Sequence, residues 1–199
     1  IVILSMLILV DLISVNKKYV SADEFTTTKK VTKPFQLSNA DKIILKDESH
    51  YRVGNFTVNP MEDGTTSYYH QSIGGYHAAK MGRYAELFEY QIARNNMEVL
   101  NMLNTKYFIV SNQDGQKEVQ INPEANGNAW FVSELVKVTS ANDEMKALDT
   151  LRTKIKAVIN TNQFNIIKNF EYQNDSKATI LLTNYNVTEL SYQSKSEKP

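Results

Sequence analysis

The hydrophobic positions along the chain follow three patterns. Residues 1–15 are apolar almost throughout, without a polar face. From Met81 to Ile92, apolar residues recur at offsets of three, four, seven and eleven, which is one face of an α-helix. Residues 178–183 and 188–192 alternate between apolar and polar, as in strands with one face in water. These patterns predict an apolar N-terminal helix, an amphipathic helix and an antiparallel hairpin.

Cap and turn residues predict most of the other elements. Ser38 is a candidate N-cap for a short helix, and the side chain of Asp41, at the third position, is placed to bond the backbone of the cap residue. Ser140 is expected to cap a second helix, 141–151. A further helix is expected over 97–104, and strands over 51–58 with Gly54 as a bulge, 106–110, 117–121, 129–138, 155–160 and 166–172. The sequence therefore predicts an α+β fold with mixed helices and a mainly antiparallel sheet.

Three regions are expected. Residues 1–20 form the end of a membrane-spanning helix or a buried apolar helix, 21–150 an α+β domain, and 151–199 a β-rich segment that begins a second β domain. About 20 apolar residues are needed to cross a bilayer, so the first run is too short alone. It also lacks the basic start of a signal peptide. We interpret it as the tail of a membrane helix; Asp11 favours the alternative of a buried helix.

Composition excludes several classes of function. In 199 residues, 22 Lys and Arg balance 22 Asp and Glu, so no overall positive charge attracts nucleic acid. Cysteine is absent, which rules out disulfides, thiolate metal sites and a cysteine nucleophile. No motif calls for a cofactor.

The densest group of candidate functional residues leads into the helix near Met81. Gly74 and Gly75 would let the backbone approach a ligand closely. Lys80 and Arg83 stand at a helix start, where the helix dipole disfavours cations and favours anions. The sequence predicts contact with a phosphate, a carboxylate or an acidic sugar. The candidate ligand-binding residues are Tyr69, His70, Gly74, Gly75, Tyr76, His77, Lys80 and Arg83.

Other interpretations of these residues stay open. The Gly-Gly pair could form only a turn, the tyrosines could pack, and the two cations could pair with Asp63, Glu86 or Glu89. The three histidines, His50, His70 and His77, could converge on a metal ion, but they lack the spacing of a known zinc motif. No catalytic residue and no metal ligand is assigned.

Several short runs resemble the YfhO family of large bacterial multi-span membrane proteins. The resemblance covers most of residues 10–135 and is thin after about residue 150. Its most specific strings are Ile-Gly-Gly-Tyr-His at 73–77 and Asn-Ala-Trp-Phe-Val at 128–132, and it also includes 10–12, 15–19, 50–53, 65–70 and 101–107. Members of that family look like glycosyltransferases that use lipid-linked sugars. The resemblance implies an extracytoplasmic domain beside the transmembrane part of the same protein, although Lys17 and Lys18 hint at the cytoplasm.

Three functions compete. The first is an accessory domain of a membrane glycosyltransferase that contacts an envelope glycan or a lipid-linked sugar phosphate, with Trp130 and tyrosines stacking on sugars. The second is a structural or protein-binding module without ligand chemistry, in which Trp130 is core. The third is a free-standing enzyme with His70 or His77 as base, which no catalytic motif supports.

Overall fold

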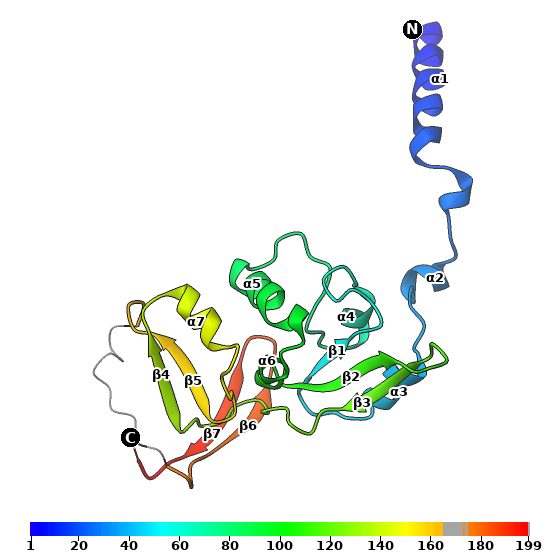
Figure 1. The fold of residues 1–199 in the computed structure, drawn as a ribbon. Coiled ribbons are helices and arrows are strands. Elements are labelled where there is room, and N and C mark those ends of the chain that lie inside the picture. The colour runs from blue at the N-terminus through cyan, green and yellow to red at the C-terminus, as the bar shows by residue number, and fades with distance from the viewer. Residues whose placement is uncertain (165–172, 174, 199) are drawn as a thin grey trace. The chain divides into compact units, whose positions relative to one another are not determined.

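The computed structural model of the protein describes residues 1–164, 173 and 175–198. The chain divides into two compact units, Ile1–Gln36 and Leu37–Pro199 (Figure 1). The expected division at residue 150 falls inside the second unit. The expected strand over 166–172 lies outside the described residues.

The first unit consists of helices α1 (Val2–Tyr19), η1 (Ala22–Glu24) and α2 (Thr28–Thr32). No residue of α1 is buried, although most of its side chains are apolar. In the part of the chain that the structure describes, no helix is both long enough and apolar enough to cross a membrane.

In its described part, the second unit combines short helices with three small sheets, so the predicted α+β class is confirmed. Its helices are α3 (Asn39–Ile44), α4 (Thr65–Tyr69), α5 (Gly82–Tyr90), η2 (Ile92–Arg94), α6 (Met97–Met102) and α7 (Ala141–Ala147). Its strands are β1 (Arg52–Asn55), β2 (Thr105–Ser111), β3 (Lys117–Ile121), β4 (Glu134–Val138), β5 (Lys156–Asn160), β6 (Thr179–Tyr185) and β7 (Leu190–Lys195).

Parallel and antiparallel pairings are equally common among the described strands. β2 lies between β1, which is parallel to it, and β3, which is antiparallel. β4 and β5 pair in parallel, and the connection between them carries α7. β6 and β7 form the predicted antiparallel hairpin.

Local capping signals explain where two helices begin. The Ser38 side chain accepts a hydrogen bond from the Asp41 backbone, and the Asp41 carboxylate accepts one from the Ser38 backbone at 2.8 Å. This reciprocal pair is the predicted capping box. The Ser140 hydroxyl caps α7 through the Asp143 backbone N–H.

Among the described residues, the core consists of two hydrophobic clusters that meet at β2. Phe108 belongs to a cluster with Ile92, Leu100 and Leu148, against which α5 packs. Tyr107 and Ile109, its neighbours in the strand, belong to a second cluster. The second cluster is completed by Ala40, Ile44, Tyr51 and Val53. Adjacent residues in a strand point to opposite faces, so β2 is covered on both sides.

Several expected elements differ from the structure. Residues 129–133 are not part of a strand, because β4 begins only at Glu134. The register shift in β1 falls between Arg52 and Val53 and not at Gly54. Between Pro60 and Gly75, where no helix or strand was predicted, the chain forms α4.

Candidate functional site

The Gly-Gly pair and Lys80 meet at one turn, Pro60–Met61. The Gly75 N–H donates to the Pro60 carbonyl at 2.7 Å, and the Lys80 ammonium donates to the Met61 carbonyl at 2.8 Å. A Cβ on Gly74 would lie 2.0 Å from the Pro60 oxygen. The close backbone approach that glycine permits here is therefore to the protein's own chain.

Arg83 points from the first turn of α5 to α7. Its guanidinium donates to the Glu144 carboxylate at 3.0 Å, and the Arg83 side chain remains 73% exposed. The N-cap of α5, Met81, provides no side-chain hydrogen bond to the helix. Neither Lys80 nor Arg83 forms the ion pairs with Asp63, Glu86 or Glu89 that the sequence left open.

The other candidate residues divide between the interior and the surface. The His70 side chain is only 2% exposed, and its Nε2 lies 2.8 Å from an Asp41 carboxylate oxygen. Burial raises the pKa of Asp41, but hydrogen bonds from Ser38 and His70 outweigh this and hold it below 3.8. Tyr76 and His77 are exposed, and Tyr69 is half-buried with its ring edge-on to Tyr68. The structure thus does not gather all eight residues at one point.

The histidines have separate surroundings. His50 stacks on Tyr185, His70 bonds Asp41, and His77 Nδ1 accepts the Ala79 N–H at 3.0 Å. Within the described ranges, no three His, Cys, Asp or Glu side chains are grouped to hold a metal ion.

Asp47 is at the centre of a polar cluster that sequence reasoning missed. Its carboxylate accepts from the Lys106 ammonium at 2.5 Å, the Tyr107 hydroxyl at 2.8 Å and the Ser49 hydroxyl at 2.7 Å. Burial raises the pKa of Asp47, but the hydrogen bonds from Lys106 and Ser49 lower it far below 3.8. Burial and the bond to Asp47 raise the pKa of Tyr107 to about 12. Because these polar groups bond one another, the cluster stabilises the fold and offers no free base.

Asp47→Asn is expected to destabilise the protein at neutral pH by about 2 kcal/mol, the scale of hydrogen bonds to a charged group. Because the pKa of Asp47 is lower in the folded state than in the unfolded state, its ionised carboxylate stabilises the fold at pH values above the unfolded pKa of 3.8. This contribution is lost progressively as the pH falls below 3.8 toward the folded pKa. The difference between the parent and the variant should therefore shrink from pH 7 to pH 2. Urea unfolding at several pH values measures it.

The matched control is Asp114→Asn, in the exposed turn between β2 and β3. It should leave the free energy of unfolding nearly unchanged. An Asp47→Asn penalty that stays the same down to pH 2 would contradict the assigned role of the ionised carboxylate.

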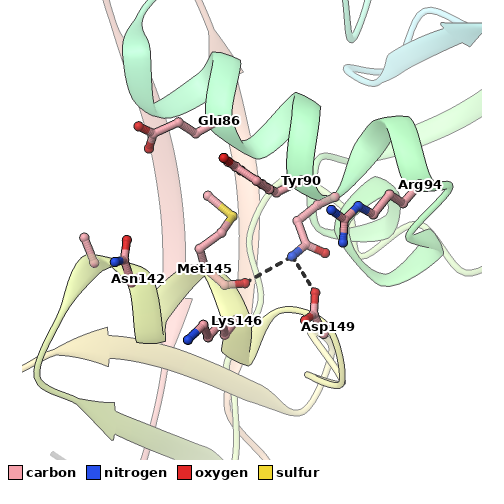
Figure 2. A pocket seen from close by; sticks show the side chains of 9 residues that line it. Glu86, Tyr90, Arg94, Asn142, Met145, Lys146 and Asp149 are labelled. Atoms are coloured by element: carbon pink, nitrogen blue, oxygen red, sulfur yellow. Dashed lines mark hydrogen bonds between the residues drawn. The ribbon is translucent and has the colours of Figure 1, made fainter.

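A groove between α5 and α7 is a second feature that the sequence did not reveal. Figure 2 shows Glu86, Tyr90 and Arg94 on one side and Met145 and Asp149 on the other. The Gln91 side chain donates to the Met145 carbonyl and to the Asp149 carboxylate and so joins the two sides. This pocket of about 370 Å³ shares Glu86, Ala141 and Met145 with a second pocket of similar volume that Arg83 and Leu87 help to line.

Such contacts join segments more than 50 residues apart, so no local pattern in the sequence predicts them. Comparisons with family models, curated proteins and solved structures found no match to the chain.

Proposed function

We propose that the chain is a membrane-anchored accessory module of a glycosyltransferase-like protein of the YfhO type. In this proposal α1 lies in the membrane, the second unit is extracytoplasmic, and its partners are the transmembrane part of the same protein and an envelope glycan or a lipid-linked sugar. The observation that carries the proposal is the exposure of α1 on every side.

Most side chains of α1 suit a hydrocarbon environment, with Asp11 as the exception in its middle. Apolar residues from Ile1 to Val15 are exposed around the whole helix, which costs free energy in water. The Ser5 hydroxyl donates to the Ile1 carbonyl at 3.2 Å, and that of Ser14 donates to the Val10 carbonyl at 2.9 Å, so neither depends on water. Lys17, Lys18 and Tyr19 follow, residue types that favour a membrane interface.

The start of α5 supports the ligand half of the proposal. The Lys80 ammonium bonds a neutral carbonyl, and Arg83 is in an exposed ion pair of the kind that contributes at most about 1 kcal/mol. An incoming phosphate or carboxylate can compete for both cations at little cost. The uncapped N–H groups of the first turn favour the same charge.

Titration with a soluble polyprenyl-phosphate analogue or an acidic oligosaccharide tests this half. We expect saturable shifts of the backbone amide NMR signals of residues 74–84, and their loss in the Lys80→Ala, Arg83→Ala double variant. Lys42→Ala with Lys46→Ala, on α3 and directly after it, is the control of equal charge. Unchanged signals in the parent would refute the contact, as would equal shifts in the double variant.

Flotation of the intact chain with phospholipid vesicles tests the anchor independently. The chain should rise with the vesicles, and complete recovery in the aqueous fraction would refute this half of the proposal.

The groove between α5 and α7 favours a second function, a docking platform for another envelope protein. Its two pockets adjoin, and the second is lined mainly by apolar side chains, including Leu87 and Leu148. Under this alternative, the Arg83–Glu144 ion pair joins α5 to α7 at the edge of the groove, and no sugar phosphate binds.

A further inference from the structure

A small polar pocket lies away from α5, where four segments meet. These segments are the start of β1, the turn between α6 and β2, the loop before β4, and β7. The pocket has a volume of about 160 Å³. The polar and aromatic side chains that line it and matter here are His50, Arg52, Asn104, Asn128, Trp130 and Tyr192.

The lining is positively charged. Arg52 supplies this charge, and the lining contains no aspartate or glutamate, although acids and bases balance over the whole chain. Among the described residues, Arg52 makes no ion pair, and its guanidinium donates only to the Leu103 carbonyl, at 3.3 Å. The pocket therefore presents a cation without an internal counter-ion.

His50 provides a second polar group. Its ring stacks on Tyr185 of β6, with 3.8 Å between the ring centres. No hydrogen-bond partner is found for the ring within the described segments, which leaves its nitrogens available. Burial and, to a smaller degree, the charge of Arg52 lower the pKa of His50, which favours the neutral ring.

Backbone geometry and an amide bridge hold the pocket open. Asn104 and Gly127 adopt positive φ angles of 56° and 89° and turn the chain on two sides of it. The Asn104 side-chain amide donates to the His50 carbonyl at 2.9 Å and to the Asn128 side-chain oxygen at 3.1 Å. Since three of the four segments are bonded to one another, a ligand need not order these three walls.

Aromatic surface completes the lining. Trp130 is half-buried and lies outside both core clusters that the structure describes, contrary to the expected buried strand. Its indole N–H donates to the Thr153 carbonyl at 2.9 Å, which fixes the orientation of the ring. Tyr192 is exposed and lines the same space. Rings of this kind offer apolar faces on which the C–H groups of a sugar can pack.

We propose that this pocket binds a single sugar ring that carries a carboxylate or a phosphate, with Arg52 contacting the anionic group. Pockets for drug-sized ligands measure roughly 300–1,000 Å³, so a pocket of about 160 Å³ accommodates one ring at most. An arginine fork matches the oxygen geometry of both acids. This inference stands whether or not the corner at Lys80 and Arg83 binds a ligand.

Intrinsic fluorescence tests the proposal, because Trp130 is the one tryptophan of the chain. Glucuronic acid and glucose 6-phosphate should each change the emission in a saturable way, and the difference between them tells which acid is preferred. Glucose and inorganic phosphate should bind at least tenfold more weakly, since each lacks one half of the recognition. The proposal would be overturned if neither acidic sugar changed the emission in a saturable way. It would also be overturned if glucose bound as tightly as the acidic sugars.

Arg52→Gln should weaken binding of the acidic sugars at least tenfold, whereas Arg94→Gln, an exposed arginine elsewhere, should not. Far-UV circular dichroism checks that the variants fold. If Arg52→Gln does not fold, replacement of the exposed Asn128 by alanine provides a second test. Parent-like binding by a folded Arg52→Gln would refute the role of Arg52. The Lys80→Ala, Arg83→Ala double variant should leave the Trp130 signal unchanged. Loss of that signal would place the binding site at α5, which would overturn this inference but not the proposed function.

Discussion

Replacing Ile8 and Leu12 of α1 by aspartate should release the chain from phospholipid vesicles. The two positions lie one turn apart on an exposed apolar helix. A carboxylate costs roughly 3 kcal/mol at the centre of an inserted helix. A tenfold change in partitioning corresponds to about 1.4 kcal/mol, so the double variant should bind at least about a hundredfold more weakly. Flotation across a series of lipid concentrations measures this change.

The conservative pair Ile8→Leu and Leu12→Ile is the matched control. It keeps the apolar volume and should float like the parent. A double aspartate variant that floats as well as the parent would show that α1 is not the part that enters the bilayer.

Gly74→Ala should destabilise the second unit by about 3 kcal/mol, the upper range for a side chain forced into a filled space. The new methyl carbon would lie 2.0 Å from the Pro60 oxygen and 2.6 Å from its carbonyl carbon, so the backbone must move. That movement breaks the bond from the Gly75 N–H and displaces the neighbouring Met61 carbonyl, which holds Lys80. Urea unfolding monitored by circular dichroism measures the loss.

Gly82→Ala is the control on the same segment. A methyl group there meets nothing within 4 Å, and alanine favours a helix over glycine by up to about 1 kcal/mol. The variant should be as stable as the parent or slightly more stable. Equal stability of the two alanine variants would mean that the Gly74 loop is not pressed against Pro60.

Features that depend on neighbouring residues were predictable from the sequence. The capping box at Ser38 and the cap at Ser140 act within four residues, and the strands β2 and β3 follow from their local patterns. Partners distant in the chain were not predictable. The sequence made His70 a candidate ligand-binding residue and a candidate base, but not a buried partner of Asp41, which lies 29 residues away and bonds its ring in the interior.

The region around Trp130 shows the same limit. Its apolar neighbours favour a strand, but the indole N–H bonds the Thr153 carbonyl, 23 residues later. The ladder between β4 and β5 begins only at Glu134, directly after the Ser133 N–H bonds the Ile155 carbonyl. The parallel pairing of β1 with β2 spans about 50 residues and was likewise invisible. For the candidate site, the sequence identified the exposed cations at the start of α5 but not Glu144 opposite Arg83.

The position of β2 between two hydrophobic clusters has a consequence for cooperativity. Phe108 is inserted in one cluster while Tyr107 and Ile109 are inserted in the other, so loosening either one disturbs the backbone that anchors its counterpart. Local unfolding of only one cluster would have to break the pairing of β2 with the parallel strand β1. The two halves of the interior should thus lose their order together, as a single folding unit.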